Sequence, residues 1–73
     1  MEKRYKIEVE AFGKRLKTLR IKKGITQLDL EIQSGISRTE ISRIENGLKN
    51  IEFFTIVKLA DALEINLSDL FKD

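Results

Sequence analysis

The chain lacks the residues on which most enzymatic and metal chemistry depends: its 73 residues include no histidine, cysteine, tryptophan or proline. Without imidazole or thiol groups it has neither the commonest general base nor a sulfur nucleophile, and it has none of the usual zinc ligands. So short a chain also buries only about 60% of its unfolded surface, which leaves little room for a catalytic cleft. We therefore expect neither an enzyme nor a metal or other cofactor.

Long hydrophobic runs are equally absent. No apolar stretch approaches the ~20 residues that a membrane-spanning helix needs, and the polar start at residues 1–4 does not resemble a signal peptide. The lack of cysteine fits a reducing compartment, so we expect a cytoplasmic protein without a membrane segment. The absence of proline and the low glycine count of four favour helix.

Charge is unevenly distributed along the chain, although the net charge is only +2. Residues 1–23 carry nine basic and three acidic groups, residues 24–49 carry three and four, and residues 50–73 carry two and five. These balances of +6, −1 and −3 give the chain one basic end, which suits a polyanion such as DNA, RNA or an anionic membrane surface. The competing interpretation is a solvated helix face whose Lys and Arg side chains serve solubility.

The spacing of apolar residues predicts an all-α fold. A first helix should begin near Ile7 and end at Gly24, because apolar residues recur there at intervals of three and four, at Val9, Phe12, Leu16 and Leu19. Apolar residues alternate over residues 5–11, which would also suit a short strand.

A short second helix should follow, ahead of a turn at residues 34–36. Thr26 and Asp29 form a variant of the capping box, which starts this helix at Gln27. Gly35 should stop it, because glycine readily adopts the left-handed conformation that ends helices.

Three more helices complete the prediction. Ser37 and Glu40 form a full capping box, the strongest start signal in the chain, for a third helix that ends at residues 46–47. A fourth and most apolar helix should lie centrally in the core and contains Phe53, Ile56, Val57, Leu59, Ala60 and Leu63. Asn66 with Asp69 caps a short fifth helix that contains Leu67, Leu70 and Phe71.

These elements predict a compact five-helix bundle that forms a single domain over residues 1–73. Residues 1–6 stand apart because they carry Lys3, Arg4 and Lys6 ahead of the predicted first helix. This segment is expected to be either a flexible basic arm that reaches a minor groove or a disordered solubilising tail.

The segment from residue 27 to residue 47 has the pattern of a helix-turn-helix. In that motif the second helix lies in the major groove, so it must hide one apolar stripe and expose base-reading side chains on the other. The hidden residues would be Ile36, Ile41 and Ile44, and the exposed residues would be Arg38, Thr39, Ser42 and Arg43. Arginine can pair with a guanine edge, threonine can contact a thymine methyl, and serine can donate or accept. An ordinary αα-hairpin with a polar outer face would show much the same pattern.

Four stretches of the chain resemble the lambda-repressor-like XRE family of Cro-type transcriptional regulators. They are Leu-Arg-Ile-Lys-Lys-Gly-Ile-Thr-Gln at 19–27, Ser-Gly-Ile-Ser-Arg at 34–38, Ile-Ser-Arg-Ile-Glu-Asn-Gly at 41–47 and Leu-Ala-Asp-Ala-Leu at 59–63. The resemblance covers about residues 11–71. It implies the lambda-repressor-like fold and binding of double-stranded DNA by a helix-turn-helix.

The resemblance also implies roles for individual residues. Gln27 matches a glutamine that holds a DNA phosphate and can touch the recognition helix, and Asn46 matches a phosphate contact at the end of that helix. Arg20 and Glu45 match a buried ion pair between the first and third helices, for which the alternative is two solvent-facing charges. The base-reading and adjacent backbone positions are matched by Ser37, Arg38, Thr39, Ser42 and Arg43.

Two positions depart from the pattern of the family. Glu31 stands where the family usually has alanine, so its carboxylate must point outwards or the helix crossing must open slightly. Residues 51–52 are Ile-Glu where many members have Pro-Ser or Pro-Thr, so the fourth helix should be less sharply capped.

A module this small needs two copies on a pseudo-palindromic operator to achieve useful specificity. We expect a homodimer through the acidic half of the chain, with a surface on the fourth and fifth helices that contains Ile51, Phe54, Leu67 and Phe71. The alternative is that these side chains close the core of a monomer.

The sequence thus predicts a small sequence-specific DNA-binding regulator of transcription, more typical of a repressor than of an activator, which reads the major groove with residues 38–45. Phage repressors, restriction-modification controllers and antitoxins look alike at this length, so a protein partner such as a toxin stays open. The alternative function is a protein-interaction module on the same fold.

Overall fold

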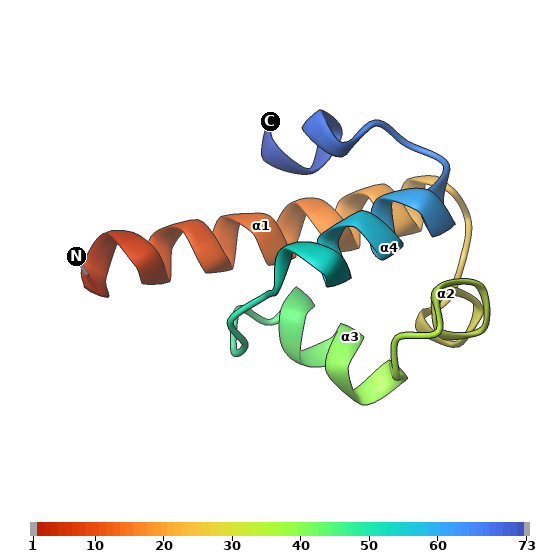
Figure 1. Ribbon diagram of the computed structural model, residues 1–73, viewed down its shortest axis with the longest axis horizontal. Coiled ribbons are helices and arrows are strands. Elements are labelled where there is room, and N and C mark those ends of the chain that lie inside the picture. Colours follow the sequence, from red (N-terminus) through yellow and green to blue (C-terminus); the bar gives the residue numbers. More distant parts are fainter. Residues whose placement is uncertain (1, 73) are drawn as a thin grey trace.

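The first helix, α1 (Glu2–Lys22), runs the length of the molecule (Figure 1). Its 21 residues span about 31 Å, close to the 34 Å longest dimension of the domain. The computed structural model describes residues 2–72, so Met1, the first residue of the expected arm, lies outside the described residues. Within them, Lys3, Arg4 and Lys6 belong to α1.

The start of α1 at Glu2 differs from the start expected near Ile7. Two local interactions support the additional turn and a half. Glu2 places an acidic group in the first turn, where it favours the helix dipole, and Arg4 Nε lies 3.8 Å from Glu8 Oε2 in an i,i+4 pair. The alternation at residues 5–11 therefore belongs to a helix and not to a strand.

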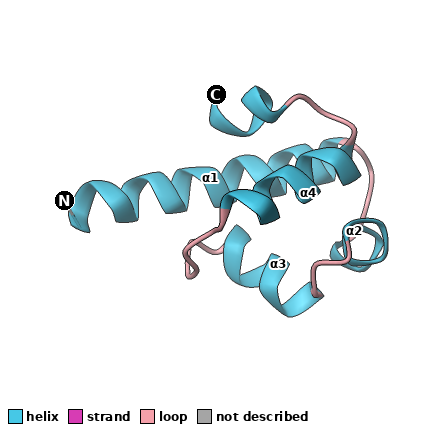
Figure 2. Cartoon of the chain, viewed as in Figure 1, coloured by secondary structure: helices cyan, strands magenta, loops and turns pink. Residues whose placement is uncertain are grey.

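The remaining elements are α2 (Gln27–Ser34), α3 (Arg38–Glu45), α4 (Phe53–Leu63) and the 3-10 helix η1 (Leu67–Phe71). Residues 2–72 contain no strand (Figure 2). The expectation of five α-helices is therefore wrong by one, because the last element is a 3-10 helix. Only five residues are available to it, and a tight i→i+3 helix suits so short a segment.

The core is built by side chains from all five elements. α1 packs on α3 and η1, α2 packs on α3 and α4, and α4 packs on η1. Fully buried side chains come from every element and include Leu16, Leu30, Ile41, Ile44, Leu59, Leu63 and Leu70. The helix-turn-helix segment is thus held between α1 on one side and α4 on the other.

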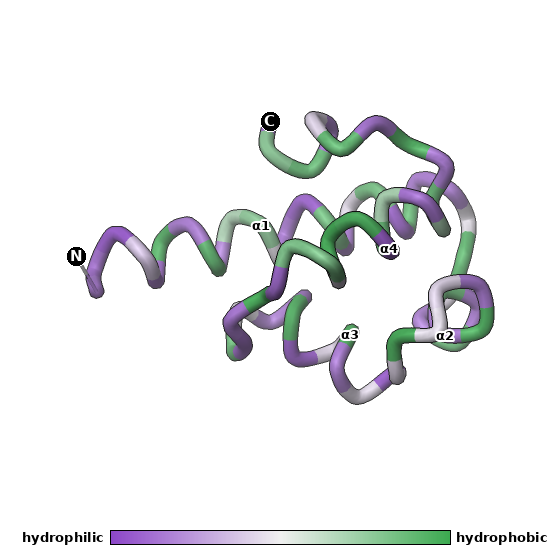
Figure 3. The backbone as a smooth tube through the Cα atoms, viewed as in Figure 1, coloured by the Kyte–Doolittle hydropathy of each residue, from purple (hydrophilic) through white to green (hydrophobic). Residues whose placement is uncertain are grey.

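The fourth helix is strongly apolar along its length (Figure 3), but the core does not take all of its apolar side chains. Ile56, Leu59 and Leu63 are buried, whereas Phe53 and Val57 are exposed, contrary to their assignment to the core. The helical rotation of 100° per residue explains the exposure of Val57, which is turned well away from the face that Ile56 and Leu63 share. Phe53 is on the face of the buried Ala60 but is exposed at the first residue of α4.

Candidate nucleic-acid interface

Side-chain caps fix the start of both helices of the motif. Thr26 Oγ1 accepts from Asp29 N at 3.0 Å and Asp29 Oδ2 accepts from Thr26 N at 2.9 Å, which makes a complete capping box for α2. Ser37 Oγ accepts from Glu40 N at 3.1 Å, but within residues 2–72 Ser37 N donates no return bond to the Glu40 carboxylate. The full box predicted for α3 is therefore only half formed, while the variant box of α2 is complete.

The aspartate of the α2 cap is held in its charged form. Hydrogen bonding first to the backbone and then to the side chain of Thr26 lowers the pKa of Asp29 below its ordinary value of 3.8. Its negative charge also lies in the first turn of α2, where it favours the helix dipole.

The turn between α2 and α3 depends on Gly35. This residue ends α2 with φ 78°, in the left-handed region that favours glycine, and its N–H donates to Glu31 O at 2.8 Å. The buried hydroxyl of Ser34 accepts from Ile36 N at 3.0 Å. Together these bonds redirect the chain within three residues and seat Ile36 in the core, as predicted.

The two faces of α3 separate as the sequence indicated. Ile41 and Ile44 are fully buried. On the other side, Ser37, Arg38, Thr39 and Arg43 are exposed and Ser42 is half-buried. An open hollow of about 320 Å³ on this side is lined by Gln27, Arg38, Thr39, Ser42 and Arg43. The structure therefore gathers five of the seven candidate DNA-binding side chains around one concavity.

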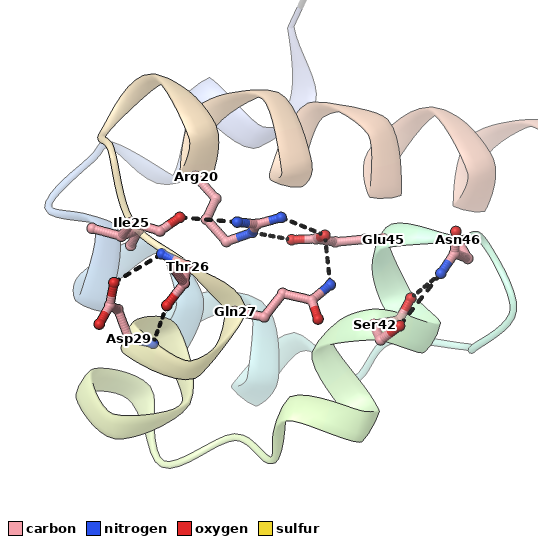
Figure 4. A network of polar contacts seen from close by, with 8 residues as sticks. All are labelled: Arg20, Ile25, Thr26, Gln27, Asp29, Ser42, Glu45 and Asn46. Carbon is pink, nitrogen blue, oxygen red and sulfur yellow. Dashed lines mark hydrogen bonds and ion pairs between the residues drawn. The ribbon is translucent and has the colours of Figure 1, made fainter.

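The other two candidates lie at the ends of α3. Ser37 is its N-cap, with its hydroxyl occupied by the bond from Glu40. Asn46 is its C-cap, and its amide nitrogen donates to Ser42 O at 2.8 Å (Figure 4). Asn46 is exposed beside the last turn of the helix.

A buried polar network joins α1, α2 and α3 behind the concavity (Figure 4). Arg20 Nε donates to Glu45 Oε2 at 2.7 Å and Arg20 Nη2 donates to Glu45 Oε1 at 3.1 Å, while Arg20 Nη1 donates to Ile25 O at 2.9 Å. The side chains of Arg20 and Glu45 are only 10% and 2% exposed. The ion pair is therefore present and buried, not two solvent-facing charges.

Gln27 belongs to the same network. Its Nε2 donates to Glu45 Oε1 at 3.0 Å, which leaves one N–H and the carbonyl oxygen of the amide available on the side of the hollow. Glu45 thus fixes the glutamine at the start of α2 relative to the helix that carries the candidate base-reading residues.

Sequence reasoning missed the role of Gly13. A Cβ atom at this position would overlap the carbonyl oxygen of Ile44 and would lie 2.9 Å from that of Glu45. The backbones of α1 and α3 therefore touch here, next to the buried ion pair. The signal available in the sequence was a glycine next to Phe12 in the apolar pattern of an otherwise regular helix.

The two departures from the family pattern are accommodated. Glu31 is half-buried, and α2 still packs on both α3 and α4. Glu52 is the N-cap of α4 and makes no side-chain capping bond, in agreement with the expected weak start of that helix.

The four candidate dimer residues do not form one exposed surface. Ile51 and Leu67 are partly buried against the core. Phe71 is exposed, yet its ring centroid lies 5.5 Å from that of Phe12, so it also covers the core. Phe54 is 71% exposed, with the Lys58 ammonium 5.0 Å from its ring centroid.

Comparison with known proteins identifies the family. A family model described as helix-turn-helix matches residues 16–70. The chain belongs to this helix-turn-helix family. The resemblance to XRE-type regulators is thereby confirmed. Separately, no helix within residues 2–72 is long and apolar enough to cross a bilayer.

Relatives of known name are regulators and controllers. The chain is 40% identical over 63 residues to the control protein C.MunI of a Mycoplasma species, which covers 85% of each protein. It is 45% identical over 58 residues to the HTH-type transcriptional repressor RghR of Bacillus subtilis, which covers 78% of this chain but only 43% of that repressor. This chain therefore spans less than half the length of RghR.

Solved structures agree with this assignment. The restriction-modification controller C.AhdI from Aeromonas hydrophila superposes with a TM-score of 0.87 at 38% identity, over 89% of this chain and 98% of that chain. The controller C.Esp1396I, solved as a tetramer with its natural 35-base-pair operator, has a TM-score of 0.76 at 26% identity, over 88% and 95%. These similarities support DNA-binding regulation of transcription as the function.

Proposed function

We propose that this helix-turn-helix protein binds double-stranded DNA sequence-specifically and regulates transcription, with α3 in the major groove. The observation that carries the proposal is the concavity in which Arg38, Thr39, Ser42 and Arg43 of α3 meet Gln27 of α2. Its side chains offer guanidinium, hydroxyl and amide groups for the edges of bases. The opposite face of α3 is fully committed to the core, so only this face is available to DNA.

The backbone of the DNA would be held at the helix ends. At the start of α2, the helix dipole and the free N–H of Gln27 suit a phosphate, and Asn46 suits another at the end of α3. Because these groups are fixed to Glu45 and Ser42, they would set the depth at which α3 enters the groove. A protein of this kind acts where the chromosome is, which in a bacterium is the cytoplasm.

Regulation of the repressor type is favoured by the named relative, since RghR is a transcriptional repressor. The similarity to C.MunI and C.AhdI favours a restriction-modification controller among the alternatives at this length. Such a regulator needs no catalytic step and no cofactor.

Selection of bound sequences from a random DNA pool tests the proposal directly. We expect a pseudo-palindromic consensus whose half-sites lie about 34 Å apart. The variant Arg43→Ala should lose about 1 to 3 kcal/mol of binding free energy and relax the preference at one base pair per half-site. Lys14→Ala is the control, because Lys14 lines a separate hollow between α1 and η1.

Two results would count against the proposal. Uniform weakening of Arg43→Ala across all sequences would make Arg43 a phosphate contact instead of a base reader. A regulator with Z phosphate contacts should show a slope near −0.9Z when the logarithm of its DNA-binding constant is plotted against the logarithm of the salt concentration. A protein-interaction module without a DNA role should show no such dependence.

We further propose that the regulator binds as a homodimer through α4. Of the expected dimer residues, Phe54 is the one that stands clear of the core, and the exposed Phe53 and Val57 lie beside it on α4. Three large apolar side chains on one short stretch of so small a domain are costly to leave in water. We therefore assign the dimer surface to Phe53, Phe54 and Val57, and no longer to Ile51 and Leu67.

Gel filtration of Phe54→Glu tests this surface. The variant should elute as a monomer and bind a two-half-site duplex more weakly, because a buried carboxylate would face the apolar side chains of the partner. Ile21→Glu places the same charge on an exposed isoleucine of α1 and should leave the mass unchanged. A dimer that persists in Phe54→Glu with DNA binding retained would exclude the surface.

A further inference from the structure

The N-terminal turns of α1 have no part in the function proposed so far. The family model begins at residue 16, yet α1 is helical from Glu2. Figure 1 shows these turns projecting past α3 and α4, beside the loop that leaves α3.

The loop after α3 packs directly against this part of α1. A Cβ atom on Gly47 would lie 2.7 Å from Glu10 Cγ and 3.1 Å from Glu10 Cα, so the two backbones are nearly in contact. Gly47 has φ 70°, which suits glycine, and its N–H donates to Ile44 O at 3.0 Å. The loop is therefore fixed both to the end of α3 and to α1.

A small open hollow of about 150 Å³ lies at this junction. It is lined by Tyr5, Lys6, Val9, Gly47, Leu48, Lys49 and Asn50. The lining residues include two lysines, one tyrosine and one asparagine, all of which carry hydrogen-bond donors. Among the described residues, no acidic side chain lines the hollow; the side chain of Glu10 packs against Gly47 beside it, and Glu8 lies 3.8 Å from Arg4 Nε.

The place of the hollow beside the end of α3 indicates which ligand it would meet. Asn46, the candidate phosphate contact, directly precedes Gly47, so the lining of the hollow begins one residue after the end of α3. A duplex that α3 enters would therefore bring its phosphates past this junction. Lysine is a point charge on a flexible stem, which suits a phosphate and carries no information about the base.

We propose that Lys6 of α1 and Lys49 of the loop together hold a DNA backbone phosphate. The projecting turns of α1 thereby enlarge the footprint of each half-site beyond the helix-turn-helix itself. The inference rests on the proposed DNA binding, because a chain that binds no duplex has no phosphate to hold.

The salt dependence of binding to a mixed-sequence duplex of about 30 base pairs tests the contact. For Lys6→Gln/Lys49→Gln, the slope of log K against log salt should fall in magnitude by about 0.9 per bound copy. Between about 50 and 200 mM salt, the affinity of the double variant should thus fall about 3.5-fold less than that of the wild type, per copy. The loss should be equal for different duplex sequences.

A charge-matched control separates a local contact from the loss of two positive charges. Lys14 and Lys22 line the hollow between α1 and η1, so Lys14→Gln/Lys22→Gln should leave the slope close to that of the wild type. Lys6→Arg/Lys49→Arg should restore the wild-type slope, because it keeps both charges. Lys6 is exposed, so Lys6→Gln alone should fold normally and is available if the double variant does not.

Ethylation interference gives an independent measurement. One phosphate per half-site whose ethylation blocks the wild type should cease to matter for Lys6→Gln/Lys49→Gln. The inference is overturned if the interference patterns are identical, if the two double glutamine variants have the same slope, or if the arginine variant restores nothing. Failure of the wild type to bind any duplex would instead overturn the proposed function first.

Discussion

Replacement of Arg20 by methionine should destabilise the domain by about 3 to 5 kcal/mol. The substitution removes all three hydrogen bonds of the guanidinium, two to Glu45 and one to the carbonyl of Ile25. Among the described residues, Glu45 then keeps the amide of Gln27 as its one side-chain partner, although its own side chain is 2% exposed. The cost arises mainly from this uncompensated buried carboxylate.

The expected loss of stability is large relative to the total free energy of unfolding of the domain. A domain of 73 residues is stable by roughly 4 to 11 kcal/mol, so Arg20→Met should lose between about a quarter of that stability and all of it. The double variant Arg20→Met/Glu45→Leu should recover most of the loss, because it removes the stranded charge and fills the space with apolar atoms. A buried pair should also respond little to salt.

Urea unfolding followed by circular dichroism measures these free energies. Arg4→Met is the matched control: the side chains of Arg4 and Glu8 are 85% and 59% exposed, so loss of that pair should cost under ~1 kcal/mol. Equal stability of Arg20→Met and the wild type would refute the reasoning. A double variant as unstable as the single one would show that packing, not the stranded charge, sets the cost.

Three further substitutions test local features of the fold. Gly13→Ala should destabilise the domain by about 1 to 3 kcal/mol in urea unfolding, because the added methyl group would overlap the carbonyl of Ile44. In a helix this change normally stabilises by about 0.5 to 1 kcal/mol, so a gain in stability would contradict the close approach. Because its pKa is lowered, Asp29 contributes stability at pH values above its ordinary pKa of 3.8, and this contribution is lost as the pH falls through the lowered pKa. Asp29→Asn should therefore flatten the acid side of a stability profile, and an unchanged profile would exclude the cap as its source. Glu64→Gly should stabilise by up to about 1 kcal/mol in thermal unfolding, since Glu64 has φ 56°, and a lower melting temperature would disprove strain there.

Features set by local chemistry were predictable from the sequence. The start of α2 at Gln27 and its end at Gly35 follow from side chains that bond to their own backbone or permit a positive φ. The buried face of α3 follows from the spacing of Ile41 and Ile44. The Arg20–Glu45 pair lies 25 residues apart in sequence, so only the resemblance to a family indicated it.

Features that depend on three-dimensional packing were not predictable in the same way. The capping box at Ser37 looked complete, but its second bond requires one particular rotamer of Glu40, which the sequence does not determine. Likewise, an apolar residue such as Phe53 belongs to a core only if a neighbouring element covers it. The hollow between α1 and the loop at residues 47–50 arises from two segments that no local pattern connects.

The polar network explains why so small a domain can hold a reading surface in place. Apolar contacts are non-directional, and they leave helices free to slide or rotate by small amounts, whereas the bonds from Arg20 and Gln27 to Glu45 are directional and join three helices at one carboxylate. A substitution that only loosens apolar packing should therefore lower stability more than it alters base preference. Loss of Gln27 should do the reverse, since the ion pair would survive while α2 lost its fixed position relative to α3. Stability and base preference are thus separable in this fold, although the carboxylate of Glu45 contributes to both.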